Sequence, residues 1–184
     1  MIPPRSHYPF PALAEPCLGT QVTEVQLKPG ELLIAHKPSL VTTVLGSCVA
    51  VTMFNARFSL GAICHAMLPQ PGREETLSET DPTRFKYVNY AVSFMVSAFR
   101  QAGLCADEVD VKLFGGGNVI GPEIDLLERP GIGSANVRMV RQLLQQESFR
   151  ISASNVGGRR GRKIVFSTHT GKVLHKHLSC MRFP

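Results

Sequence analysis

The pattern of apolar and polar positions divides the chain into short extended runs and two helical stripes. Apolar residues that alternate with polar ones, or that follow one another in short runs, predict strands. These runs are Val22–Leu27, Leu32–Ala35, Val49–Phe54, Leu60–Leu68, Val109–Phe114, Arg150–Val156, Lys163–Ser167 and Val173–Leu178. Two other segments repeat apolar residues at three- and four-residue spacing, which is typical of a helix with one buried face.

The first helix is predicted to begin at Asp81, a capping residue followed by proline, and to end at Gly103. Its apolar stripe consists of Phe85, Val88, Val92, Met95 and Phe99. The second helix is predicted over Ser134–Gln146, with Val137, Val140, Leu143 and Leu144 on its buried side. Strands and helices in this order predict an α/β (α+β) fold, with mixed and largely antiparallel sheets packed with two or three helices.

Turn residues indicate which strands are paired. Lys28-Pro29-Gly30 is predicted to join the first two strands into an opening hairpin, and Thr170-Gly171 to close the last one. The polar loop Asn55–Ser59 predicts a third, antiparallel hairpin. Five prolines in the first twenty residues predict a flexible tail over 1–21, which leaves 22–184 as a single domain.

Composition narrows the class of protein. With 43% hydrophobic and 18% charged residues, the chain is not disordered. It has no apolar stretch long enough to cross a membrane and no pattern of a secretory signal. Five cysteines without a CxxC pair favour free thiols in a reducing cytoplasm. The net charge of +6 permits an acidic partner without requiring one.

One cysteine stands in a setting suited to catalysis. Cys48 follows Gly46 and Ser47 at a turn into a strand, where backbone N–H groups are able to face a bound oxyanion. If the hairpin loop is centred on Arg57, Cys48 lies opposite Ala66 and next to His65. A histidine there is able to take the thiol proton and lower the thiol pKa through an ion pair. The alternative is a small buried cysteine beside a satisfied core histidine.

The motifs around these residues resemble the chemoreceptor glutamine deamidase CheD family. The resemblance rests first on Thr42-Thr43-Val44-Leu45-Gly46-Ser47-Cys48-Val49-Ala50-Val51 and on His65-Ala66-Met67-Leu68-Pro69. It continues through Tyr87-Val88-Asn89, Phe114-Gly115-Gly116, Ile132-Gly133 with Asn136-Val137, Gly157-Gly158, Gly161-Arg162-Lys163 and Thr170-Gly171-Lys172-Val173. It therefore covers nearly everything from Val22 to Leu178. One departure is Asn155, where the family often has aspartate.

The resemblance implies a cysteine-hydrolase-like site with Cys48 as nucleophile, His65 as base and Thr42 as the residue that orients the base. In this interpretation the side chain of Thr43 faces away from the site, because neighbouring side chains of a strand point to opposite faces. The implied activity is that of a protein-glutamine glutaminase. The same chemistry would also allow glutamyl methylesterase activity as a side activity. The implied partners are the cytoplasmic helical bundles of methyl-accepting chemotaxis receptors. An alternative role is that of an adaptor for the phosphatase CheC.

Other signals are weaker. The basic run Arg159–Lys163 raises nucleic-acid binding as a third hypothesis, but without interleaved aromatic residues it is more typical of a solvated loop. His175 and His177 share one face of a strand, yet a metal site needs three or four convergent ligands, so no metal and no cofactor are predicted. The glycine run 115–117 is interpreted as a tight turn beside the substrate groove, because no phosphate-loop lysine follows.

Overall fold

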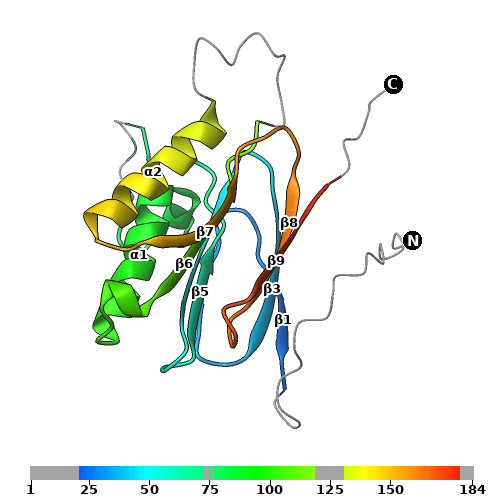
Figure 1. Cartoon of the computed structure of the whole chain (residues 1–184). Helices are drawn as coiled ribbons and strands as arrows, with labels where there is room; N and C mark the ends of the chain where they lie inside the picture. Colours follow the sequence, from blue (N-terminus) through cyan, green and yellow to red (C-terminus); the bar gives the residue numbers. More distant parts are fainter. Residues whose placement is uncertain (1–20, 73–74, 76, 119–130, 179–184) are drawn as a thin grey trace.

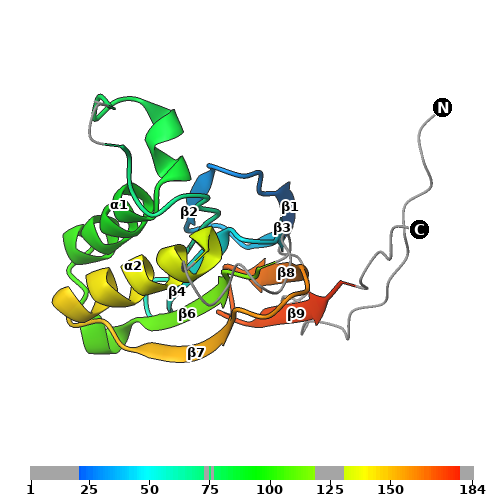
Figure 2. The same ribbon diagram turned by 90° about the horizontal axis from the view of Figure 1, so that it is seen from above.

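Two β-sheets face each other, and two helices cover the outer face of one of them (Figures 1 and 2). This computed structural model describes residues 21–72, 75, 77–118 and 131–178. The predicted tail therefore lies outside the described residues except for Gln21, and the division into tail and domain stays a prediction. Among the helices of the described ranges, none has the length and apolarity that crossing a bilayer requires.

The sheets are mixed, as predicted. The four-stranded sheet has the order β1 (Thr23–Gln26), β3 (Ser39–Leu45), β8 (Arg162–Ser167) and β9 (Val173–His177). The five-stranded sheet has the order β2 (Leu32–Ala35), β5 (Leu60–Cys64), β4 (Val49–Asn55), β6 (Asp110–Gly115) and β7 (Ile151–Val156). Only the pairs β1–β3 and β6–β7 run parallel, so antiparallel pairing dominates the described strands.

The predicted opening hairpin is wrong. β1 pairs with β3 in one sheet and β2 pairs with β5 in the other, so the first turn links the two sheets and does not join neighbouring strands. Gly30, with φ of 81°, makes the change of direction, and its N–H donates to the carbonyl of His65 at 2.8 Å. The turn chemistry was correctly identified, but the partner of each strand is set by contacts far away in the sequence.

The hairpin of β4 and β5 is confirmed, but its register differs by one residue. Asn55 pairs with Leu60 and Val49 with Ala66, so Cys48 falls opposite Met67 and not opposite Ala66. The cause is the side chain of Asn55, whose Oδ1 accepts a hydrogen bond from the N–H of Phe58 at 2.9 Å. This bond closes the loop between Asn55 and Leu60 and moves its centre half a residue beyond Arg57.

The helices lie where the periodicity places them, with one break. Asp81 caps the short 3-10 helix η1 (Pro82–Lys86) by accepting from the N–H of Thr83 at 2.8 Å. Tyr87 is extended and forms a bridge with Leu68, which separates η1 from α1 (Val88–Gln101). A second 3-10 turn, η2 (Ala106–Glu108), precedes β6, and α2 spans Ile132–Gln146.

Two apolar layers hold the elements together. The larger layer lies between the helices and the five-stranded sheet, and it includes Val49, Ala62, Met95, Phe99 and Val140. The second layer lies between the two sheets and is formed by Leu27, Val41, Leu45, Ala50, Ile63, Phe114, Ile164 and Phe166. Successive side chains of β4 and β5 alternate between these two layers, so one face of each strand meets the helices and the other meets the opposite sheet.

Candidate active site

Cys48 lies on the short segment that carries the chain from one sheet to the other. β3 ends at Leu45 and β4 begins at Val49, and the half-buried Cys48 packs against the layer between the sheets. Within the described residues, the N–H groups of Gly46, Ser47 and Cys48 donate no hydrogen bond to another residue. The N–H of Cys48 faces its own thiol, whereas those of Gly46 and Ser47 are unengaged, and unengaged backbone donors beside a thiol are what an oxyanion site requires.

The glycine run after β6 supports this turn from behind. The N–H of Gly116 donates to the carbonyl of Cys48 at 2.7 Å, and the N–H of Gly117 donates to the carbonyl of Gly46 at 2.8 Å. Gly115 has φ of 105°, and a Cβ on it would lie 2.2 Å from the carbonyl oxygen of Cys48. Only glycine fits so close to another backbone. The interpretation of this run as a tight structural turn is therefore confirmed.

Cys48 and His65 face the same layer. In the observed register Cys48 lies opposite Met67, so His65 is its diagonal neighbour on the same face of the ladder. Ala50 and Ile63, the next residues on this face, belong to the layer between the sheets. The shift of register by one residue is what places thiol and imidazole on one side.

Thr43 connects the imidazole to the opposite sheet. Its hydroxyl donates to the carbonyl of Leu27 at 2.9 Å, because a carbonyl oxygen only accepts. The same hydroxyl lies 2.7 Å from Nδ1 of His65. Because its only proton is donated to Leu27, it accepts a hydrogen bond from Nδ1. Nδ1 therefore carries the ring proton and Nε2 has the free lone pair. Nε2 is buried and has no partner among the described residues, which leaves it available as a base.

The prediction that Thr42 makes this contact, with Thr43 facing away, is wrong. Thr43 is fully buried between Val41 and Leu45, which face the layer between the sheets, whereas Thr42 lies on the other face of β3. The prediction was right that Thr42 and Thr43 lie on opposite faces of the strand, but it placed Thr42 on the face that points toward the site. The pattern of two apolar residues flanking Thr43 at two-residue spacing was a signal that pointed to the correct face.

The backbone of His65 is held at both ends by the first turn. Its N–H donates to the carbonyl of Glu31 at 2.9 Å, and its carbonyl accepts from the N–H of Gly30. Leu27, through Thr43, completes the support from the same part of the chain. Sequence reasoning missed these positioning contributions of residues 27–31, because they depend on the pairing of β1 with β3 and of β2 with β5.

Burial keeps both groups neutral in this state. It lowers the pKa of His65 to about 4, with a small opposing effect from the negative charge of Glu31. Burial also raises the pKa of Cys48, an effect that its own backbone N–H partly offsets. The predicted ion pair that lowers the thiol pKa is not favoured by these shifts, and it stays a prediction. Hydrogen bonds between catalytic groups are often formed only when substrate is bound.

The other described cysteines lie in different settings. Cys64 points into the layer under the helices, where full burial raises its pKa to about 11. Cys105 is exposed at the start of η2. Cys17 and Cys180 lie outside the described residues. Cys48 is the one described cysteine that combines partial exposure with a histidine on the same face.

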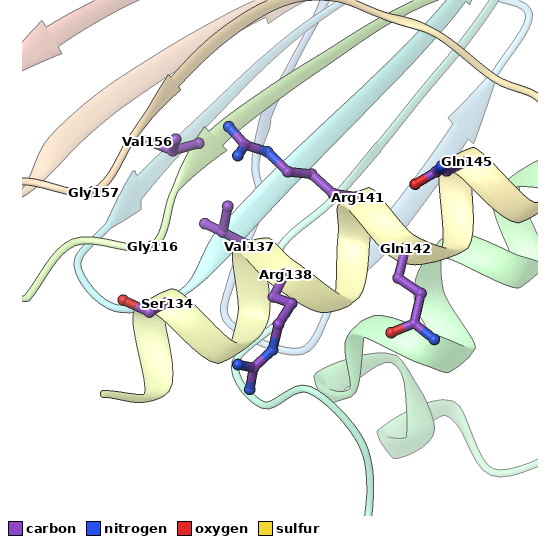
Figure 3. A pocket seen from close by; sticks show the side chains of 9 residues that line it. All are labelled: Gly116, Ser134, Val137, Arg138, Arg141, Gln142, Gln145, Val156 and Gly157. Carbon is purple, nitrogen blue, oxygen red and sulfur yellow. The ribbon is translucent and has the colours of Figure 1, made fainter. Parts of the chain in front are cut away.

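A groove of about 510 Å³ runs between α2 and β7 beside the turn (Figure 3). It is lined by Gly116, Ser134, Val137, Arg138, Arg141, Gln142, Gln145, Val156 and Gly157. Gly116 connects the groove to the backbone of Cys48, which confirms that the glycine run lies beside a groove. Figure 3 shows Arg138 and Arg141 leaving the helix in different directions. Both are exposed, and neither forms an ion pair with a described residue.

The basic run Arg159–Lys163 is not a uniformly solvated loop. Arg162 is only 1% exposed, and its guanidinium donates to the carbonyls of Asn155 and Gly157. It also donates to Oδ1 of Asn155 at 2.8 Å. Asn155 thus serves as a neutral acceptor for a buried cation. Across the described part of the chain, no three His, Cys, Asp or Glu side chains gather as metal ligands do.

Comparisons with known proteins identify relatives of this chain. The family model "CheD chemotactic sensory transduction" matches residues 67–177. "Probable chemoreceptor glutamine deamidase CheD 2" of Geobacter sulfurreducens is 45% identical over 159 residues, which cover 86% of this chain and 92% of that protein. "Probable chemoreceptor glutamine deamidase CheD" of Maridesulfovibrio salexigens is 35% identical, over 86% of this chain and 94% of that protein. Matches of this length necessarily include Cys48 and His65.

Similarity to solved structures is lower. The crystal structure of Bacillus licheniformis hypothetical protein YfiH is 13% identical, with a TM-score of 0.45. The similar part covers 75% of this chain and 65% of that chain.

The neutral His65 predicts a loss of stability in mild acid. The pKa of its imidazole is about 4 in the folded protein, against an ordinary value of 6.5, so the unfolded chain binds an extra proton between these values. The contribution of His65 to the free energy of unfolding is fully present above the ordinary imidazole pKa. It is lost as the pH drops toward 4, by at most about 1.4 kcal/mol per pH unit. Urea unfolding across this window should therefore show a steeper decline for the unmodified protein than for His65→Gln. Equal slopes would contradict the buried neutral imidazole.

Proposed function

Because this chain belongs to the CheD family, we propose that it hydrolyses glutamine side chains of methyl-accepting chemotaxis receptors to glutamate and ammonia. The relatives are named as chemoreceptor glutamine deamidases and match nearly the whole chain. The observation that carries the proposal is the contact of Thr43 with Nδ1 of His65, which leaves Nε2 without a partner on the same face as the thiol of Cys48. A cysteine beside a correctly oriented base is the arrangement that acyl transfer through a thioester requires.

The reaction follows from the positions of these groups. Nε2 of His65 takes the thiol proton as Sγ of Cys48 attacks the side-chain carbonyl carbon of the substrate. The carbonyl oxygen becomes an oxyanion, which the unengaged N–H groups of Gly46 and Ser47 are placed to receive, together with the N–H of Cys48. His65 returns its proton to the departing nitrogen, and ammonia leaves a thioester. Water, deprotonated by His65, then attacks the thioester and releases glutamate and the thiol.

Thr43 acts on this cycle through the imidazole. When Nε2 takes the proton, the ring becomes a cation in a buried site, which costs free energy without a compensating acceptor. The hydroxyl of Thr43 accepts from Nδ1–H and is itself polarised by the carbonyl of Leu27. This chain of two hydrogen bonds keeps the tautomer and stabilises the cation without adding a negative charge.

The groove beside the turn is proposed to receive the receptor. Arg138 and Arg141 carry positive charge on its helical wall, which suits the glutamates that deamidation leaves near remaining glutamines. Such receptors present helical bundles in the cytoplasm, where this protein is proposed to act.

Cleavage of glutamyl methyl esters by the same thioester route stays a prediction. Pairing with CheC also stays a prediction, which co-purification would test.

Mass spectrometry of a receptor cytoplasmic fragment tests the proposed reaction. Incubation with the unmodified protein should convert specific glutamines to glutamates, located by peptide mapping. Cys48→Ala should abolish the conversion, because no nucleophile remains. His65→Ala should lower the rate by about 10²–10⁴-fold, the usual contribution of a general base. A folded Cys48→Ala variant with full activity would refute the proposed mechanism.

The two threonines provide a matched test of the support for His65. Thr43→Val removes the acceptor for Nδ1–H at nearly constant volume and should slow turnover strongly, while Thr43→Ser should retain most of it. Thr42→Val, on the other face of β3, should have little effect. Steady-state kinetics on the same receptor fragment measures all three. If Thr42→Val is slow and Thr43→Val is fast, the observed contact has no catalytic role.

Charge reversal on the groove tests receptor binding. Arg141→Glu should raise KM by about three- to tenfold, the scale of about 1 kcal/mol for exposed charges, and leave kcat nearly unchanged. Arg150→Glu is the control, because this exposed arginine makes the same charge change outside the groove lining. Equal KM values for the two variants would exclude the groove from receptor recognition.

A further inference from the structure

Asn136 interrupts the buried stripe of α2 with a polar side chain. The buried residues of this helix are Gly133, Asn136, Val140 and Leu144, which lie along one face. Asn136 is completely buried, at a position where an apolar residue of similar volume would pack without loss of hydration. A buried amide at such a position needs hydrogen-bond partners to compensate for that loss.

The amide of Asn136 bridges the two segments of the candidate active site. Its Nδ2 donates to the carbonyl of Ser47 at 3.1 Å and to the carbonyl of Met67 at 2.9 Å. Ser47 precedes the nucleophile, and Met67 lies two residues after His65. The opposite orientation of the amide would place its oxygen against both carbonyl oxygens, so the contacts define which atom is nitrogen. Oδ1 has no partner among the described residues, so the amide is held through its two donors.

This bridge stands where the ladder of β4 and β5 ends. The last ladder pair, Val49 with Ala66, exchanges two hydrogen bonds of 2.9 Å. Beyond it the N–H groups of Met67 and Leu68 both turn to the carbonyl of Lys86. No backbone donor of the His65 segment is then left for the carbonyl of Ser47, and the side chain of Asn136 takes that place.

Two glycines allow a side chain this short to reach. A Cβ on Gly133 would lie 2.6 Å from the carbonyl oxygen of Gly116, and a Cβ on Gly116 would lie 2.3 Å from Cγ2 of Val137. The first turns of α2 therefore lie directly against the glycine run that also supports Cys48. This close packing presents Asn136 to both carbonyls at once.

We propose that Asn136 is a positioning residue that sets the spacing between the thiol of Cys48 and Nε2 of His65. It touches neither reacting group and acts by holding the backbone on which each one is mounted. Its effect on turnover rests on the proposed glutamine deamidation, whereas its effect on the thiol does not. Displacement of catalytic groups by about 1 Å typically costs about 10²-fold in rate.

Asn136→Leu separates positioning from packing. The variant keeps the number and branching of the side-chain heavy atoms and removes both donors, so kcat for the receptor fragment should fall by about 10²-fold while KM is retained. Val140→Ala, one turn further along the same buried stripe, is the control for lost packing. Urea unfolding gives the stability of both variants. If Val140→Ala loses as much stability and keeps its kcat, general destabilisation does not explain the loss in Asn136→Leu.

The rate of Cys48 alkylation by iodoacetamide, followed by peptide mapping, tests the bridge without receptor. We expect His65→Ala to lower this rate, Asn136→Leu to lower it similarly, and the double variant to show no further decrease. Decreases that multiply in the double variant, or an Asn136→Leu rate equal to that of Val140→Ala, would overturn the proposal. If the unmodified protein has no deamidase activity, the proposed function is refuted. The role of Asn136 is still decided by the alkylation rates, which do not depend on that activity.

Discussion

The fold depends on a constraint of chain length at one end of the two sheets. Only Gly46, Ser47 and Cys48 separate β3, an inner strand of the four-stranded sheet, from β4 at the centre of the five-stranded sheet. So short a connection forces the sheets to converge there and leaves no residue to spare for secondary structure. The backbone groups of the turn must then find partners elsewhere. The glycine run after β6 and the amide of Asn136 supply them.

The same constraint explains the composition of the site. The thiol of Cys48 lies on the connection between the sheets, and the imidazole of His65 directly follows β5. Thr43 lies on β3 in the opposite sheet. Because the sheets converge, the imidazole is buried, and burial lowers its pKa to about 4, so it is neutral at physiological pH. A neutral ring needs a defined tautomer to act as a base. Thr43 provides it by donating to Leu27 and accepting from Nδ1 of His65, and this second contact also joins the two sheets.

Particular residues show how far sequence reasoning reached. Cys48 was singled out by the glycine before it, and His65 by the hairpin that brings it near, because both signals are local. The one-residue error in register arose from Asn55, whose side chain closes the loop in a way that symmetry about Arg57 does not anticipate. The assignment of Thr42 rested on the family resemblance and failed because the inward face of β3 is the one that carries Val41, Thr43 and Leu45. The first predicted helix is interrupted at Tyr87, because this residue forms a bridge with Leu68, which is distant in sequence, and is therefore extended.

The sequence by itself determined most of the elements, the mixed sheet class, the turn before β4 and the two residues proposed for the chemistry. These features follow from periodicity, from turn residues and from motifs that act over a few neighbouring positions. The tertiary structure decided the partners of β1 and β2, the choice of Thr43, the tautomer of His65 and the bridge made by Asn136. Each of these depends on atoms that meet only when the sheets and α2 pack together. A hydrogen bond between residues 69 or 89 positions apart leaves no mark in local spacing.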